Sequence, residues 1–426
     1  MKYRVDRKHL FFVFLFYTFL FNEPLASIIP FWGYEDELIA ICAVPIFLFV
    51  YYRKNSKKIS LGVLPYITCF VVCGVLGSLI YSYQDFFRTA LPDILICIKF
   101  WLCLYFGMQV FKNYDLNKYS YRISLHIKLV AWLFFFLSIL NYSFGMFSFY
   151  DHRYGIGANS LFYSHPSVLI SHCSFLIILI LGILPKFKHP LFYIIIISIT
   201  MCTSLRSKAL ANAMIFAIIY FFVVVKKEGF SAMSLIPFAP LIIFIGWAQI
   251  EFYFISLGDT SARSQLLLKS FVVAKDHFPI GSGFGTYGSY YSAIHYSPLY
   301  YQYGLNRIYG MSEEFRSFIC DSFWPMILAQ SGFIGLIFYV LGVYRFFVRL
   351  TSLKEISKFY YCSALGAFGY LLVDSTAATA FVHPLSMPIA SWVGILLSSL
   401  YRVSADNGNH NRELRKEKDA ALSRCV

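Results

Sequence analysis

Two arginines occupy positions where a lone cation is unfavourable. Arg206 lies in TMCTSLRSKALAN, a small and polar stretch that joins two apolar helices at a predicted turn. Arg263 falls in the first turn of a predicted helix, where the helix dipole disfavours a cation unless an anion also binds there. Because a guanidinium binds phosphate through two parallel hydrogen bonds, both positions suggest an anionic ligand. Salt bridges to Asp259, Asp276 or Asp321 are the alternative.

The stretch HFPIGSGFGTYGSYY, residues 277–291, has the glycine spacing of a dinucleotide-binding loop at Gly283, Gly285 and Gly288. Such a loop follows a buried strand, opens a helix and has an acidic residue about twenty positions later. The preceding segment here is predicted to be helical, so the pattern argues against a nucleotide. It favours a tight turn in which Gly281, Gly283 and Gly285 shape the loop and let it re-enter the membrane surface.

The composition is that of a membrane protein. Of 426 residues, 58% are hydrophobic, 20% aromatic and 14% charged, and the mean hydropathy is +0.63. Apolar runs of about 17 to 25 residues, each long enough to cross a bilayer as a helix, recur along the chain. The sequence therefore predicts an all-α fold, a polytopic membrane helix bundle. The ten cysteines show no spacing typical of a metal site, and we expect neither a metal nor a cofactor.

About twelve crossings are predicted from these runs. They lie near residues 10–31, 38–52, 61–83, 90–111, 126–144, 163–184, 190–205, 208–225, 234–256, 319–344, 359–375 and 383–401. Alternate connections are basic, which accounts for the net charge of +14 without nucleic acid and predicts that both termini are cytoplasmic. Residues 1–402 would form the bundle, and the polar tail 403–426 a disordered cytoplasmic end.

The connection between the ninth and tenth predicted helices, residues 257–318, is long and lies on the non-cytoplasmic side, so we expect function there. It begins with a predicted amphipathic helix at 261–276. Eight tyrosines follow between 287 and 309, among them Tyr287 and Tyr290, together with His295. Their rings are suited to stacking on sugars, and an aromatic belt at the membrane interface is an equal alternative.

Several cations depart from the charge rule by lying on the outer side. They are Arg88, Arg153, Arg206, Lys208, Arg263, Lys269, Lys275, Arg307 and Arg316. Contact with lipid phosphate is the simplest explanation for the outer-side positions of four of them, Arg88, Lys269, Lys275 and Arg307. Lys99, inside the fourth span, is a candidate ligand residue or the partner of Asp93 or Asp374. For His165 and His172 a hydrogen-bonded packing role is favoured over a functional one.

Three segments together resemble the superfamily of O-antigen ligases and O-antigen polymerases, which are bacterial envelope glycosyltransferases. The segments are TSLRSKALAN at 203–212, SARSQLLLKSFVVAKDHFPIGSGFGTYGS at 261–289, and DSFWPMILAQSGFIGLIFYVLG at 321–342. The middle one is the most specific: Ser261, Arg263, Pro279 and the glycines match a small residue before arginine, an apolar helix, a proline and a glycine series. Beyond residues 200–345 the resemblance rests on hydropathy alone.

The resemblance implies a glycan donor on undecaprenyl pyrophosphate at the periplasmic face of the inner membrane, with Arg206 and Arg263 on the pyrophosphate. In the ligases the third segment usually begins with a histidine, which is the proposed base. In this sequence Asp321 has that position. The difference favours a polymerase, with Asp321 as the candidate base. The further expected substrate contacts are Lys99, Arg153, Arg316, Tyr287, Tyr290 and His295.

The expected partners are the lipid-linked oligosaccharides themselves, a chain-length regulator and a flippase, with no nucleic acid. A ligase that delivers the glycan to lipid A core is the closest alternative. A flippase or exporter of the same lipid-linked sugars is an alternative of another class, and it predicts cations spread through the bundle interior rather than gathered at one outer mouth.

Overall fold

The computed structural model is mainly helical and has almost no sheet. It describes residues 6–52, 62–153, 155–226, 251–256, 258–376 and 378–400, with residues 240 and 247. In these ranges the only strands are β1 (His152–Arg153) and β2 (Ile156–Gly157), which pair as a short antiparallel hairpin. The prediction of an all-α fold is confirmed.

The helices of the described residues are of α, 3-10 and π type. In chain order they are α1 (Arg7–Leu20), α2 (Asn22–Ile28), η1 (Pro30–Tyr34), α3 (Glu35–Tyr52), α4 (Leu64–Tyr81), η3 (Phe86–Ala90), α5 (Leu91–Val110), α6 (Leu116–Phe144), α7 (Pro166–Gly182), η4 (Leu184–Lys186), α8 (Pro190–Cys202), α9 (Ser207–Tyr220), η5 (Phe221–Val225), η7 (Glu251–Ser256), η8 (Gly258–Thr260), α11 (Ala262–Asp276), α12 (Tyr290–Ile294), α13 (Pro298–Gln302), η9 (Leu305–Arg307), α14 (Phe323–Thr351), η10 (Ser352–Glu355), α15 (Lys358–Ser375) and η11 (Pro384–Ser386). The last helix spans Pro384–Leu400 when η11 is included.

Within the described residues, five helical segments are long and apolar enough to cross a membrane, and the number is six if the bent pair α1–α2 counts as one span. The five are Leu64–Tyr81, Phe86–Val110, Leu116–Phe144, Ser207–Val225 and Phe323–Glu355. The helices Pro166–Gly182, Pro190–Cys202 and Pro384–Leu400 are apolar but shorter. The count of twelve stays a prediction: most of the ninth predicted crossing, 234–256, and the whole tail 403–426 lie outside the described residues.

The first predicted crossing is not one straight helix. Helices α1 and α2 are bent by 80° at Phe21. Pro24 has no N–H to donate to the carbonyl of Leu20, so the helical hydrogen bond that would carry α1 through the bend is missing. The hydroxyl of Tyr163 donates to that carbonyl instead, at 2.7 Å. Proline therefore causes the bend, and a side chain from the start of the sixth predicted crossing satisfies the freed carbonyl.

Helix α14 is also interrupted, at Gly332, whose φ of 67° and ψ of −173° are not helical. The break leaves the carbonyls of Ala329 and Gln330 free to accept the N–H groups of Ser282 and Gly283, each at 2.9 Å. The glycine loop thus completes the backbone hydrogen bonding of a broken helix.

The glycines of this loop allow backbone to touch backbone. A Cβ on Gly281 would lie 2.3 Å from the nitrogen of Gly332, and one on Gly283 would lie 2.5 Å from the nitrogen of Ser78 in α4. Both glycines have positive φ, at 79° and 97°. The N–H of Gly285 donates to the buried carboxylate of Asp93 at 2.8 Å. The loop therefore packs between α4, α5 and α14, and its backbone N–H groups donate to acceptors within the protein.

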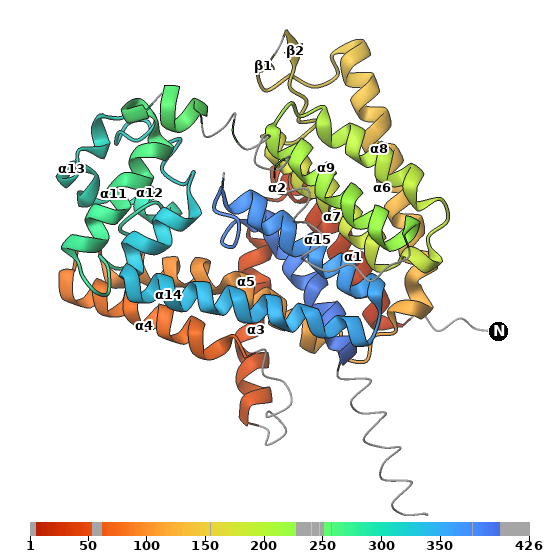
Figure 1. Cartoon of the computed structure of the whole chain (residues 1–426), viewed down its shortest axis with the longest axis horizontal. Helices are drawn as coiled ribbons and strands as arrows, with labels where there is room; N and C mark the ends of the chain where they lie inside the picture. Colours follow the sequence, from red (N-terminus) through yellow and green to blue (C-terminus); the bar gives the residue numbers. More distant parts are fainter. Residues whose placement is uncertain are drawn as a thin grey trace, which may run out of the picture.

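The segment from α11 to α14 folds around a small hydrophobic core of its own, which includes Leu266, Tyr287, Leu299, Tyr300 and Met311. Figure 1 shows α11, α12 and α13 together above one end of α4 and α14, apart from the group formed by α6, α7, α8 and α9. The N-terminal cap of α11 is Ser261, whose hydroxyl accepts the N–H of Ser264. Residues 261–319, called the loop subdomain below, are thus a folded unit.

Contacts between helix ends orient the bundle. Near the start of α1, His9 Nδ1 lies 2.9 Å from the Tyr114 hydroxyl, just after α5. The hydroxyl of Tyr360 in the first turn of α15 donates to Asn117 in the first turn of α6, at 3.4 Å. The starts of α1, α6 and α15 therefore gather at one end of the bundle, next to the basic residues Lys8, Lys112 and Lys118.

Gly281→Ala should destabilise the folded protein by about 1–3 kcal/mol, because the new methyl would overlap the backbone at Gly332. Gly304→Ala is the matched control, since Gly304 has a similar φ of 71° but nothing within 4 Å of its Cβ. Unfolding midpoints of the purified variants in detergent measure the difference. Equal midpoints would contradict the close approach of the loop to α14.

Candidate functional site

Arg206 lies at the N-terminal boundary of α9 and pairs with Asp151. Its Nη2 is 3.2 Å from Asp151 Oδ2, and its side chain is 13% exposed. The guanidinium also lies over the ring of Tyr150, 5.5 Å from the centroid. Arg153, on β1, donates from Nε to the same carboxylate oxygen at 3.2 Å. Two predicted site arginines thus share one carboxylate.

Arg263 pairs with Asp321. Its Nη2 lies 3.3 Å from Asp321 Oδ2, linking the first turn of α11 to the residue before the N-cap of α14. Burial raises the pKa of Asp321, and the charges of Arg263 and, more weakly, Lys208 oppose that rise. The two residues that the resemblance assigned to pyrophosphate and to proton transfer are therefore in contact.

Lys208 connects these pairs. It lies in the first turn of α9, and its Nζ is 2.9 Å from Oδ1 of Asp374 in the last turn of α15. Burial lowers the pKa of His165, and the charge of Lys208 lowers it further. Lys208 also acts electrostatically on Asp321. Asp151 acts electrostatically on His165 as well. Lys208 is therefore near both arginine pairs, Arg263–Asp321 directly and Arg206–Asp151 through the shared neighbour His165.

Two half-buried histidines border the same region, each just before a helix. Nδ1 of His165 accepts the N–H of Ser167 at 3.0 Å, and Nδ1 of His383 accepts the N–H of Leu385 at 3.3 Å. Burial lowers the pKa of His383 to about 4, with Asp374 and Lys208 acting on it in opposite directions. A neutral imidazole that accepts at Nδ1 carries its proton on Nε2, so each histidine can present an N–H donor.

These residues form the cation cluster, defined as Arg153, Arg206, Lys208 and Arg263 with their carboxylates Asp151, Asp321 and Asp374. The four cations exceed the three carboxylates by one charge. Helices α9, α11 and α14 begin next to Arg206, Arg263 and Asp321. Their N-termini add partial positive charge, because the first N–H groups of a helix have no partner within it. This arrangement is suited to an anion with several oxygens, such as a diphosphate.

Sequence reasoning did not assign Lys208, Asp151, Asp374 or His383 to the site. Lys208 had a usable signal, because it follows Arg206 by two residues and shares its helical turn. Asp151 had the same kind of signal, because it precedes Arg153 by two residues and pairs with it. Asp374 had none, since only the packing of α15 brings it near Lys208.

Lys99 does not join the cation cluster, and its two expected partners were wrong. It is 1% exposed and pairs with Asp36 and, at 3.0 Å, with Glu37 at the start of α3. Asp93 instead accepts the Gly285 N–H, and Asp374 pairs with Lys208. The buried lysine thus ties α5 to α3.

Other expected substrate contacts serve the loop subdomain. Arg316 donates from Nη1 to the carbonyls of Ala293 and Ile294 at 2.6 and 2.8 Å. Tyr287 is fully buried and donates to the carbonyl of Leu266 at 2.7 Å. Both roles are structural. Tyr290 and His295 are exposed on the surface of the subdomain.

Among the described residues no group of three or more histidine, cysteine, aspartate or glutamate side chains is placed to hold a metal ion. No protein-family model, no curated protein and no solved structure matches the chain. The function is therefore argued from the residues themselves.

Lys208→Met should lower the free energy of unfolding by about 3 kcal/mol, because it leaves the Asp374 carboxylate, 5% exposed, without its cation. The double variant Lys208→Met with Asp374→Leu should recover most of that loss, since no buried charge is left unpaired. Chemical unfolding in detergent tests both. If the double variant is as unstable as the single one, the loss of stability does not come from leaving the Asp374 carboxylate without its cation.

Acid should destabilise the protein partly through His383. In the unfolded chain this imidazole titrates near 6.5, whereas in the folded protein its pKa is about 4. The unfolded state then binds more protons, so the contribution of His383 to stability is complete above pH 6.5 and is lost as the pH falls toward 4. His383→Gln should flatten this part of the profile of melting temperature against pH. An unchanged profile would contradict the lowered pKa of His383 in the folded protein.

Proposed function

We propose that the protein is a membrane glycosyltransferase that polymerises a polysaccharide of the O-antigen type. The donor is a growing glycan on undecaprenyl pyrophosphate, and the acceptor is the sugar of an incoming lipid-linked repeat unit. The observation that carries the proposal is the cation cluster, in which Lys208 of α9 lies within electrostatic reach of Asp321, the partner of Arg263, and of His165 beside the Arg206–Asp151 pair. The resemblance of the segments around these residues supplies the substrate class.

In the proposed reaction the acceptor hydroxyl oxygen forms a bond to the anomeric carbon of the donor sugar. The bond from that carbon to the diphosphate oxygen breaks, and its electron pair leaves on the diphosphate. Arg206, Lys208 and Arg263 stabilise the charge that develops there, a role for which fixed donors in a water-poor site are effective. The hydroxyl proton passes to the Asp321 carboxylate, which is 33% exposed and can release it to water.

Asp321 is a better base than the histidines of the region. Nδ1 of His383 already accepts an N–H from Leu385, and Nε2 carries the proton of the neutral ring, so neither nitrogen can take a proton from substrate. Nε2–H groups of His165 and His383 are instead suited to donate to phosphoryl oxygens. Histidine therefore has an electrophilic role here and carboxylate the basic one.

We propose that the cation cluster faces the periplasm. Helices α9 and α15, which carry Lys208 and Asp374, have the basic residues Lys226 and Lys358 near their other ends, and the start of α15 lies at the same end of the bundle as Lys8, Lys112 and Lys118. By the positive-inside rule those ends are cytoplasmic. The finer topology, with about twelve crossings, both termini inside and residues 257–318 outside, follows from the same rule. A chain-length regulator and a flippase in the inner membrane are the proposed partners.

A ligase that transfers the glycan to lipid A core would need the same diphosphate site and is distinguished by its acceptor. A flippase would need cations along a path through the bundle. Lys99 is one buried cation, but two carboxylates already engage it. The grouping of four cations at one end of the helices favours a transferase.

Arg206→Ala, Arg263→Ala and Asp321→Ala should each reduce polymerisation by at least about a hundredfold, because each removes a group that acts in the transition state. The assay supplies purified protein with lipid-linked repeat units alone and resolves the products on a gel. Arg307→Ala, which changes an exposed arginine of the loop subdomain, is the control and should leave the ladder intact. Normal ladders in all three variants would refute the proposal, and a product formed only with lipid A core would make the protein a ligase.

A further inference from the structure

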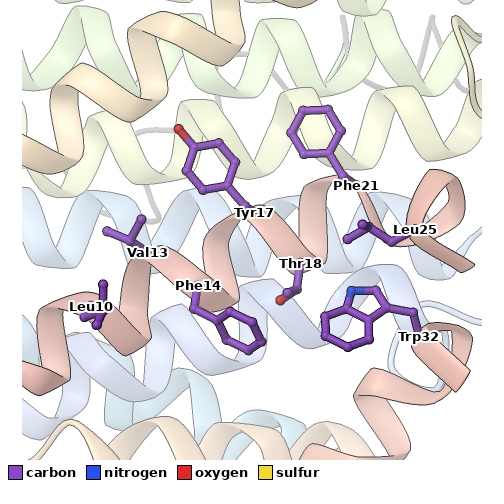
Figure 2. Close-up of a pocket in the computed structure, with 8 residues that line it drawn as sticks. All are labelled: Leu10, Val13, Phe14, Tyr17, Thr18, Phe21, Leu25 and Trp32. Atoms are coloured by element: carbon purple, nitrogen blue, oxygen red, sulfur yellow. The ribbon is translucent and has the colours of Figure 1, made fainter. Parts of the chain in front are cut away.

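A hollow of about 510 Å³ runs along α1 (Figure 2). Its lining side chains are hydrocarbon apart from the hydroxyls of Tyr17 and Thr18 and the indole of Trp32. Such a lining suits the chains of ordinary bilayer lipid, so it selects no particular ligand. A second hollow, on the loop subdomain, differs from it in both lining and neighbours.

This second hollow has a volume of about 520 Å³, within the usual range for ligand pockets. Two aromatic rings, Tyr309 and Phe315, line it together with the polar side chains of Asn306 and Ser312. Tyr309 is 75% exposed and Phe315 41% exposed. Rings exposed to this extent contribute little to the core of the subdomain, so a ligand can reach them. These four residues define the aromatic pocket.

The loop that carries the two rings fixes their positions. The carbonyl of Gly310 accepts the N–H of Phe318 at 2.9 Å, which closes the loop. Within it the hydroxyl of Ser312 accepts the N–H of Phe315 at 3.1 Å. Tyr309, Phe315 and Phe318 pack against one another with ring centroids between 5.1 and 6.3 Å apart. Because the rings are already held in place, a ligand that stacks on them has little ordering cost to overcome.

The aromatic pocket lies next to the candidate base. The N–H of Asp321 donates to the carbonyl of Phe318 at 3.3 Å, so Asp321 follows the three packed rings within one turn of the chain. Asp321 in turn pairs with Arg263 of the cation cluster. A glycan whose first sugar is attached to a diphosphate at the cation cluster therefore has the aromatic pocket beside it.

The lining of the pocket matches the chemistry of a sugar. One face of a pyranose ring carries mainly C–H groups and packs on an aromatic ring, while its edge carries hydroxyls. Tyrosine and phenylalanine offer a large, rigid contact area at low entropic cost. The amide of Asn306 and the hydroxyl of Ser312 can each donate and accept hydrogen bonds at the edge of such a ring. A hydrocarbon chain would use the rings but not these polar groups.

We propose that the aromatic pocket holds the growing glycan by stacking one of its sugar units on Tyr309 and Phe315. The inference rests on the proposed function and locates the saccharide part of its substrate. Each transfer passes the whole glycan to a new carrier, and a glycan held in the pocket stays near the cation cluster at a high effective concentration for the next transfer. The pocket therefore makes chain growth processive.

Binding of the free glycan tests the pocket without turnover. The probe is the oligosaccharide that mild acid releases from the lipid-linked oligomers of the cell that makes this protein. It is titrated onto the full-length protein in detergent and followed by saturation-transfer NMR. Tyr309→Ala and Phe315→Ala should each weaken binding about fivefold, because each removes a stacking ring. Tyr309→Phe keeps the ring and should bind the probe as the wild type does.

Two control variants separate stacking from other effects. Phe271→Ala removes a phenylalanine that is 51% exposed elsewhere in the loop subdomain. Arg307→Ala removes a charge that borders the pocket and leaves both rings in place. Neither variant should change the affinity. A loss in Arg307→Ala without a loss in Tyr309→Ala would mean that the hollow holds an anion, and it would overturn the proposal. Equal binding by the wild type and Tyr309→Ala, or no binding by either, would also overturn it.

The products formed early in polymerisation give a second readout. With lipid-linked repeat units in large excess, the wild type should make long chains while most units are still unreacted. The double variant Tyr309→Ala with Phe315→Ala keeps the cation cluster, so it should still form a ladder, but of short oligomers that lengthen together with time. A wild-type distribution in the double variant would overturn the inference and leave the proposed function standing. Oligosaccharide binding by a wild type that forms no ladder would refute the proposed function and leave the pocket assigned to a glycan.

Discussion

The structure depends on one constraint: in hydrocarbon, each backbone N–H and C=O group needs a partner within the protein. At Pro24 the helix cannot supply the partner of Leu20, and the Tyr163 hydroxyl does so. At Gly332 the break in α14 exposes two carbonyls, and the N–H groups of Ser282 and Gly283 bind them. Each irregularity is thus tied to a segment far away in the sequence, and the ties fix where the loop subdomain and α2 lie.

The same constraint explains the glycines. The N–H groups of Gly283, Phe284 and Gly285 donate to the Gln330 carbonyl, the Ser78 hydroxyl and the Asp93 carboxylate, so none of the three is left to cradle a phosphate. The positive charge that the proposed anion site needs would come from arginine and lysine at helix starts. Gly281 and Gly283 matter because a side chain would push the loop away from α4 and α14. Because these glycines let the loop pack closely against α4 and α14, they help to place Arg263 at the end of the bundle where Arg206 lies.

Periodicity and composition predicted the helices well, because an apolar run of span length has one stable form in lipid. The helix at 261–276 was expected, and α11 spans Ala262–Asp276. The bend at Phe21 was missed because Pro24 lies two residues inside α2, where proline is compatible with a new helix. In the site, Arg206, Arg263 and Asp321 could be named from local pattern. A salt bridge to Asp321 was named as an alternative, and Arg263 makes it. The pairs Arg206–Asp151 and Lys208–Asp374 could not be named, because they form only after α9 has packed beside α15 and the segment that follows α6.

The pairing of Arg206, Lys208 and Arg263 with carboxylates bears on how such a site could turn over. Three cations without counterions in a water-poor region would repel one another and would hold a diphosphate too tightly to release it. With Asp151, Asp374 and Asp321 in place, an arriving diphosphate exchanges ion pairs instead of creating them, so the net gain in free energy is modest. Asp321 has a second consequence, since a diphosphate that draws Arg263 away leaves its carboxylate more basic. Binding of the donor would in this way prepare the base for the acceptor hydroxyl.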